Sequence, residues 1–375
     1  MNRRVFFGQA LAAPMFISAW RSSPPKPYLG ELTDMMKAAS LPGMVIGAVR
    51  AHKTAWITPL GVRSADSPDT VTASTLFQAA SLTKQVTAHA AHALRAQGKL
   101  DFDRTLVSYV DDLANDMART VTVRQVLSHS SGFPNWRYAD RGQPVPDLKP
   151  AFAPGSKFQY SGEGYFYLQR VLEEVSGLGF GQIARKFVFE PLGMSSSTLV
   201  WDPNTADRTA GAHTRGGEAR TGRDKAPRSL RDWAGRSGKA VEDLKYADYS
   251  SWRRESGEAV LPDSMLPNGA ASMVTSAEDY ARFVAAAMKT PGLEKPEVKM
   301  NEWLGWGLGW GIEQYAGHTY LWQWGDNPGF KNFVLAEPAT GDAIFVFTNG
   351  DSGAKLYDRV VTHATGHDHP ALMRV

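Results

Sequence analysis

Strand patterns lie at both ends of the sequence and helical patterns lie between them, and this arrangement most constrains the fold. Residues 44–49 (MVIGAV) and 54–58 (TAWIT) predict a hairpin near the N-terminus. Near the C-terminus, residues 306–313, 320–323, 330–337 and 343–348 are β-rich and separated by Gly, Pro and Asn, which predicts consecutive antiparallel strands. We therefore expect one antiparallel sheet built from both ends of the chain.

The helical patterns place a second region inside this sheet. Apolar residues recur every three to four positions, or turn residues mark helix ends, in segments 29–39, 81–97, 121–128, 164–175, 180–189, 276–288 and 354–364. The fold class we predict is α/β (α+β): an antiparallel sheet flanked by N- and C-terminal helices, with an inserted all-helical domain. The expected boundaries are 28–80 and 268–375 for the sheet domain and 81–267 for the mostly helical domain, with a polar surface insertion at 214–260.

The first 27 residues predict an export signal and linker. Arg3 and Arg4 precede an apolar run that continues to about Trp20, and a Pro-rich stretch follows. The arginine pair resembles a twin-arginine signal, which implies a periplasmic location; the alternative is a loosely structured N-terminal arm. The run is too short and too broken for a stable membrane span, and no later segment approaches 18 apolar residues.

Composition excludes several classes of function. The net charge is only +3 and no basic stripe occurs, so we expect no nucleic-acid partner. The chain has no cysteine, which rules out Cys nucleophiles, thiolate metal sites and disulfides. The sequence also lacks Gly-x-Ser-x-Gly, His-Glu-x-x-His and a phosphate-binding glycine loop. His363, His367 and His369 offer a metal site or a polar tail, and we favour the tail.

Ser81 and Lys84 form the strongest candidate for catalytic chemistry. On a helix, positions i and i+3 share a face, so the Lys84 ammonium can reach the Ser81 hydroxyl. A serine hydroxyl needs a neighbouring base, and an amine serves as that base only if burial or nearby positive charge lowers its pKa. The same spacing occurs at Ser23 and at Ser352, but only Ser81 heads a long amphipathic helix.

The segment around Ser81 resembles a known family. Residues 77–84 (FQAASLTK) look like the active-site segment of penicillin-binding-protein-like serine hydrolases, which include class C β-lactamases, D-alanyl-D-alanine peptidases and related esterases. Further matches follow in order at 126–134 (VLSHSSGFP), 152–162 (FAPGSKFQYSG), 189–194 (FEPLGM), 268–273 (NGAASM) and 325–330 (GDNPGF). The resemblance covers about residues 40–350 and implies a serine β-lactamase-like fold.

The resemblance assigns Tyr160 as a proton relay that faces Ser81 and Lys84. A nearby Lys cation makes a phenol useful in proton transfer by stabilising its anion. Tyr138 is a rival, but it lacks the preceding Pro-Gly-x-x-Phe segment. We expect His129 to fix its loop through a hydrogen bond rather than to act as a triad base.

The third family motif departs from the usual Lys- or His-Thr/Ser-Gly triplet, because its position carries Gln323, Trp324 and Gly325. Residues 220–222 (RTG) are a superficial rival inside the polar insertion. The backbone N–H of Asp326 is expected to complete an oxyanion hole with that of Ser81.

These departures affect the expected substrate. Gln323 offers a hydrogen bond and Trp324 an aromatic wall, where the family has a cation that helps to hold a substrate carboxylate. Gly162 likewise replaces the Asn that would contact an acylamide side chain. Trp303, Trp306, Trp310 and Trp322 are as compatible with sheet packing as with a cleft wall.

The sequence thus predicts an esterase-leaning serine hydrolase that forms an acyl-serine on small ester or amide substrates. The alternatives are a β-lactamase or D-alanyl-D-alanine carboxypeptidase acting on a β-lactam or peptide, and a non-catalytic binding protein of the same fold. The mechanism requires no metal or organic cofactor. The sequence leaves the oligomeric state open.

Overall fold

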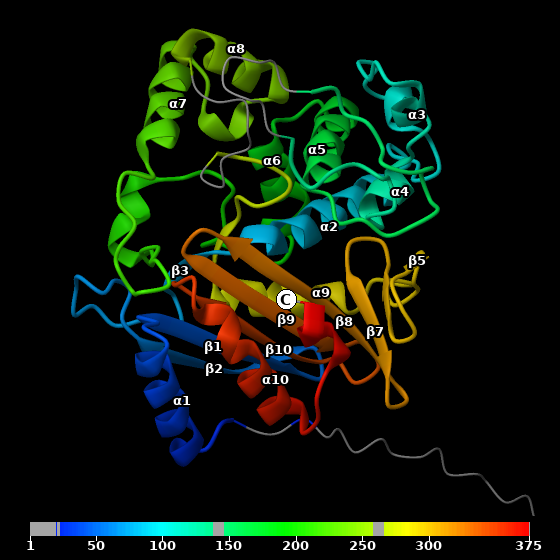
Figure 1. Cartoon of the computed structure of the whole chain (residues 1–375). Coiled ribbons are helices and arrows are strands. Elements are labelled where there is room, and N and C mark those ends of the chain that lie inside the picture. The colour runs from blue at the N-terminus through cyan, green and yellow to red at the C-terminus, as the bar shows by residue number, and fades with distance from the viewer. Residues whose placement is uncertain (1–19, 21–22, 138–145, 258–265, 375) are drawn as a thin grey trace, which may run out of the picture.

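The computed structural model describes residues 20, 23–137, 146–257 and 266–374. Its centre is an antiparallel sheet of eight strands in the order β2-β1-β10-β9-β8-β7-β6-β5 (Figure 1). β1 (Gly43–Arg50) pairs with β10 (Asp342–Thr348), with Val45 opposite Phe347. Strands from both ends of the chain therefore lie side by side, which confirms the sheet expected from the sequence.

The remaining strands extend the sheet in both directions. Their bounds are β2 (Lys53–Gly61), β9 (Phe330–Glu337), β8 (His318–Asn327), β7 (Gly311–Tyr315), β6 (Leu304–Trp306) and β5 (Val298–Lys299). The single strand expected over 306–313 was wrong: it is two strands joined by a turn, in which Gly309 has a φ of 106°. A separate two-stranded sheet joins β3 (Leu76–Gln78) to β4 (Val274–Ser276).

Helices cover both faces of the large sheet. Side chains of β1 alternate between two buried clusters, with Met44 and Ile46 in one and Val45 and Val49 in the other, as the pleat of a strand requires. α1 (Lys26–Ala38) and α10 (Tyr357–Thr365) pack on the first face. α9 (Ala277–Ala287) covers the second, where the ring of Tyr280 lies 5.2 Å from that of Phe345.

The middle of the chain forms a helical region beside the sheet (Figure 1). Its helices are α2 (Thr83–Ala96), α3 (Asp116–Arg119), α4 (Val123–Leu127), α5 (Gly162–Ser176), α6 (Phe180–Ala184), α7 (Lys225–Arg236) and α8 (Tyr246–Ser256). The Ser161 hydroxyl caps α5 by accepting from the N–H of Gly164 at 2.9 Å. This cap fixes the path of the backbone just after Tyr160.

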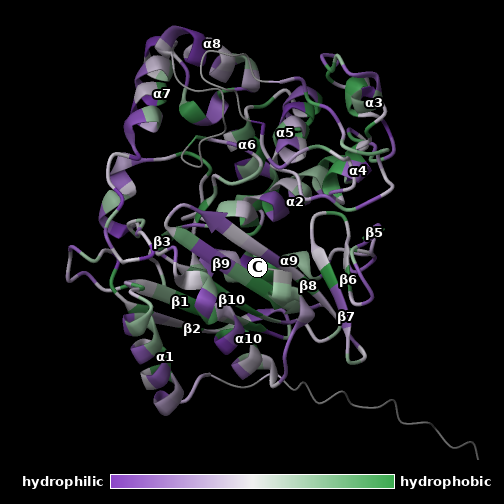
Figure 2. Ribbon diagram, in the orientation of Figure 1, coloured by the Kyte–Doolittle hydropathy of each residue, from purple (hydrophilic) through white to green (hydrophobic). Residues whose placement is uncertain are grey.

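The described part of the segment 214–260, residues 214–257, is more regular than its composition indicates. It contains α7 and α8, which form a small apolar core of their own around Leu230, Trp233 and Trp252. Hydrophilic residues, drawn in purple, alternate along these helices with less polar ones (Figure 2). Only one narrow face is apolar, so the abundant charge concealed the helical period from the sequence analysis.

Two further expectations concern the N-terminus and membranes. Residues 1–19, where the export signal was placed, lie outside the described residues, as does Tyr138. Trp20 is buried, and its indole N–H donates to Glu337 at 2.8 Å. Among the described helices, none is long and apolar enough to cross a membrane.

Candidate active site

Ser81 lies where the small sheet meets the helical region. β3 leads into a 3-10 turn, Ala80–Leu82, from which α2 begins at Thr83. Ala80 adopts a left-handed conformation with φ of 53°, which is unusual for a residue with a Cβ and is typical of functional sites. Ser81 is therefore placed at a sharp bend, and it remains 9% exposed.

Strand β8 approaches this bend closely at Gly325. A Cβ on Gly325 would lie 2.4 Å from the carbonyl oxygen of Ala79, which is far inside van der Waals contact. Only glycine therefore lets β8 pass so near to the segment that carries Ser81, the candidate nucleophile. The next residue, Asp326, directs its carboxylate to Lys331 at 2.5 Å, so its side chain is engaged outside the bend.

Lys84 is the base candidate that the structure brings to Ser81. Its Nζ lies 3.1 Å from Ser81 Oγ and donates to the carbonyl of Ala270 at 2.9 Å. The side chain is fully buried, and burial lowers the pKa of the amine from 10.5 to about 7. Among the described residues no carboxylate forms an ion pair with Lys84, so nothing restores the charged form. A buried amine of this kind is half deprotonated near neutral pH.

Tyr160 joins the same cluster from the loop before α5. Its hydroxyl accepts from Gln323 Nε2 at 3.2 Å and hydrogen-bonds Ser81, while its ring lies 4.8 Å from Lys84 Nζ. Burial raises the pKa of Tyr160 well above its usual value, although the hydrogen bonds with Ser81 and Gln323 offset part of this rise. Tyr160 therefore keeps its proton at neutral pH.

Gln323 is fully buried and contacts both Ser81 and Tyr160. Besides Tyr160, its amide nitrogen donates to the Ser81 carbonyl at 3.2 Å, so both of its N–H bonds are directed at this pair. The amide thus takes the place of the family's cation as a neutral donor. A dipole stabilises a phenolate less than a full charge does, which is consistent with the raised pKa of Tyr160.

An aromatic wall encloses Tyr160 on its other sides. The Trp324 ring lies 4.7 Å from the Tyr160 ring, and that of His129 lies 4.2 Å from it. Nδ1 of His129 accepts from the N–H of Ser161 at 3.0 Å, which agrees with the loop-fixing role expected for it. Burial, followed by the charge of Lys84, lowers the pKa of His129, so the imidazole is neutral.

Other candidates lie outside this cluster. Gly162 is buried under the ring of Trp136, which lies 2.5 Å from where a Cβ would stand. Among the other tryptophans discussed above, Trp306, Trp310 and Trp322 are fully buried and Trp303 is 44% exposed. Arg220 pairs with Asp351.

The C-terminal histidines form no metal site within the part of the chain that the structure describes. His369 is buried rather than part of a polar tail, and its Nδ1 contacts Glu313 at 2.7 Å. His363 stacks on Tyr28 with ring centroids 3.6 Å apart. These contacts attach the C-terminal segment to the sheet and to α1.

Two groups that support the site were not predicted from the sequence. The carbonyl of Ala270 holds Lys84, and the amide of Asn332 donates to the Gln78 carbonyl at 2.9 Å, just before the bend. The family motif at residues 268–273 contains Ala270 and was therefore a signal for the first group. Nothing in the sequence indicated the second, because it depends on the pairing of β8 with β9.

Comparison with known proteins agrees with this geometry. The model of the Beta-lactamase family matches residues 31–365. The chain belongs to the Beta-lactamase family. This confirms the family resemblance found in the motifs and places the protein among β-lactamase-fold serine hydrolases.

The relatives of this chain in the Beta-lactamase family are named for different activities. The chain is 26% identical over 306 residues to penicillin-binding protein 4 of Amycolatopsis lactamdurans, covering 76% of this chain and 75% of that protein. It is 26% identical over 326 residues to esterase EstB of Burkholderia gladioli, covering 73% of this chain and 77% of the esterase. A class C β-lactamase structure superposes with a TM-score of 0.70 at 19% identity, covering 92% and 97% of the two chains, which shows the fold.

Proposed function

We propose that the protein is an esterase-leaning serine hydrolase in which Ser81 forms the acyl intermediate. The observation that carries this proposal is the buried Lys84 amine, 3.1 Å from Ser81 Oγ, whose pKa of about 7 lets it act as a base at neutral pH. Its neutral form donates to the Ala270 carbonyl and turns its lone pair to the Ser81 hydroxyl.

The reaction divides into acylation and hydrolysis. Ser81 Oγ attacks the ester carbonyl as its proton passes to Lys84, and the N–H groups of Ser81 and Asp326 receive the oxyanion. The bond to the leaving alcohol then breaks, and Tyr160 gives that alcohol its proton and recovers one from the Lys84 ammonium. Water attacks the acyl-serine, its proton follows the same path in reverse, and the carboxylic acid leaves.

The preference for neutral esters rests on Gln323 and Gly162. Gln323 supplies no positive charge for a substrate carboxylate, and its amide N–H groups are engaged by Tyr160 and Ser81. Gly162 offers no side chain to an acylamide, and Trp136 occupies that space. The similarity to an esterase supports this preference, whereas the similarity to a penicillin-binding protein supports the alternative of a β-lactamase or carboxypeptidase.

One comparison separates these candidates. We expect the purified protein to hydrolyse p-nitrophenyl acetate much faster than a chromogenic cephalosporin, and to form a mass adduct with a fluorophosphonate. Ser81→Ala should abolish both the turnover and the adduct. Faster cephalosporin turnover would favour the β-lactamase, and neither turnover nor adduct would favour a non-catalytic binding protein.

We also propose export through the N-terminal segment. The paired Arg3 and Arg4 ahead of an apolar run carry this proposal. Expression in a bacterial host with a twin-arginine pathway should yield a processed protein in the periplasm. Retention of the double variant Arg3→Lys/Arg4→Lys in the cytoplasm would support an export signal, and unchanged export of this variant would contradict it.

A further inference from the structure

The loop before β4 holds the candidate base, since the Ala270 carbonyl accepts from Lys84 Nζ at 2.9 Å. The preceding residue of this loop, Gly269, is itself held from two sides. The hydroxyl of Thr87, one turn after Lys84 on α2, donates to the Gly269 carbonyl at 2.7 Å. From α5, the side-chain oxygen of Gln169 accepts from the Gly269 N–H at 2.9 Å. The position of the carbonyl that binds the amine therefore depends on a side chain of α5.

Gln169 can accept this bond in only one orientation of its amide, and Glu173 selects that orientation. Gln169 is fully buried, and its Nε2 donates to Glu173 Oε1 at 2.8 Å. An ionised carboxylate accepts hydrogen bonds and donates none, so the amide must turn its nitrogen to Glu173 and its oxygen to Gly269. Burial raises the pKa of Glu173 to about 7, although hydrogen bonds from Tyr246 and Gln169 offset part of this rise. The carboxylate is therefore ionised in mildly alkaline solution.

The second oxygen of Glu173 extends these hydrogen bonds to the helices α7 and α8. It accepts from the backbone N–H of Tyr246, the first residue of α8, at 2.8 Å. α7 and α8 lie on the side of the helical region away from the large sheet (Figure 1) and share an apolar core of their own. Two side chains of α5 thus connect this pair of helices to the loop that holds Lys84.

Building on the proposed function, we propose that Gln169 is a positioning residue for Lys84 and that Glu173 orients Gln169 for this task. Without the Gln169 oxygen, the N–H of Gly269 is left unpaired in the interior, and the loop shifts to find it a partner. The carbonyl of Ala270 moves with the loop, so the amine that it holds is displaced from the nucleophile. A displacement of about 1 Å at a reacting group costs up to about 100-fold in rate.

Kinetics at pH 9 test this role, because Lys84 and Glu173 are both mainly deprotonated there. Gln169→Met keeps the length of the side chain but removes the acceptor, and it should lower kcat for p-nitrophenyl acetate by at least about tenfold. KM should stay within about threefold, because Lys84 serves both acylation and hydrolysis and the two steps slow together. Labelling to completion with a fluorophosphonate counts the active sites, so loss of folded protein is not mistaken for loss of kcat.

Exchanging the two side chains provides a rescue. Glu173→Gln alone leaves one acceptor oxygen for two donors, the Gln169 amide and the Tyr246 N–H, and should lower kcat by about three- to tenfold. The double variant Gln169→Glu/Glu173→Gln again has an acceptor for Gly269 and a donor–acceptor pair between the two side chains. Its kcat should return to within about twofold of the native value. Glu174→Gln, at an exposed neighbouring position of α5, is the matched control and should leave kcat unchanged.

The outcomes separate this role from the proposed function. Turnover that depends on Ser81, with a native kcat per labelled site in Gln169→Met, would overturn the positioning role alone. If Gln169→Met yields no folded protein, the comparison of Glu173→Gln with the double variant decides: a double variant no faster than Glu173→Gln would overturn the proposal. Absence of any turnover or adduct in the native protein would refute the proposed function and the positioning role with it.

Discussion

Replacing Lys84 by methionine tests the central feature of the site through stability rather than activity. The amine is fully buried, and its pKa is about 7 in the folded protein against an ordinary value of 10.5. The folded state therefore binds fewer protons than the unfolded chain between these two pH values. Stability therefore rises with pH across this window, whereas at lower pH Lys84 imposes a constant penalty that adds no pH dependence.

The magnitude follows from the two pKa values. Burying Lys84 costs about 4 kcal/mol at pH 7 and about 2 kcal/mol at pH 9, because less of the unfolded chain is protonated at the higher pH. Lys84→Met removes this penalty, although it also leaves the carbonyl of Ala270 without its donor. The free energy of unfolding of the variant relative to the native protein should therefore fall by about 2 kcal/mol from pH 7 to pH 9.

Urea denaturation followed by tryptophan fluorescence at both pH values measures this difference. Lys99→Met is a matched control, since Lys99 is exposed. It should leave the pH dependence of the native protein unchanged. If Lys84→Met and the native protein show parallel stability between pH 7 and 9, the buried amine does not have a lowered pKa, and the proposed base is refuted.

Three further predictions concern activity. The profile of kcat/KM against pH should rise through about pH 7 as Lys84 loses its proton, and a plateau that extends below pH 5 would contradict Lys84 as the base. Tyr160→Phe should lower kcat by about 10²- to 10⁴-fold with little change in thermal unfolding, and a kcat within threefold of the native value would remove Tyr160 from the proton path. His129→Phe should lower kcat by displacing the Tyr160 loop yet keep the ascending limb near pH 7, whereas a shift of that limb would show that His129 itself titrates in the reaction.

The sequence was sufficient to predict that the candidate residues Ser81, Lys84 and Tyr160 lie together, because its signals are local. Ser81 in the 3-10 turn and Lys84 in the first turn of α2 are three residues apart, and Tyr160 follows a recognisable turn before a capped helix. The common sheet was also predictable, since strand patterns lie at both ends. The order of the strands was not predictable, because it depends on pairing between residues some 300 positions apart in the chain, such as Val45 and Phe347.

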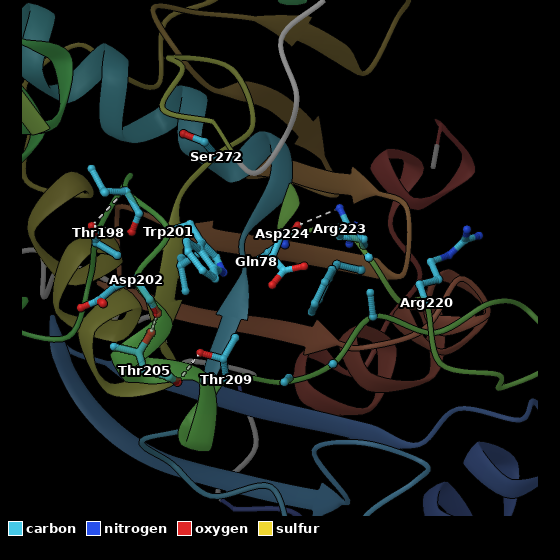
Figure 3. Close-up of a pocket in the computed structure, with 18 residues that line it drawn as sticks. Gln78, Thr198, Trp201, Asp202, Thr205, Thr209, Arg220, Arg223, Asp224 and Ser272 are labelled. Carbon is cyan, nitrogen blue, oxygen red and sulfur yellow. Dashed lines mark hydrogen bonds between the residues drawn. The ribbon is translucent and has the colours of Figure 1, made fainter. Parts of the chain in front are cut away.

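Other features depend on contacts that no local pattern encodes. Gln323 was expected to meet substrate, but its burial against Tyr160 and Ser81 arises only when β8 crosses the bend. The cavity of about 400 Å³ beside the small sheet arises where the segment 198–224 returns to β3, with Thr209 bridging to Leu76 (Figure 3). α7 did leave a signal, since Leu230, Trp233 and Ala234 follow helical spacing, but its many charges concealed it.

The pairing of β1 with β10 also has a consequence for biosynthesis. The interior strand β1 waits for a partner that is translated some 300 residues later, so the sheet forms only after the chain has been made as far as Thr348. Such a high contact order slows folding and leaves the apolar edge of β1 unprotected on the ribosome. A chain truncated before Asp342 lacks a central strand rather than a peripheral one, and we expect it to aggregate.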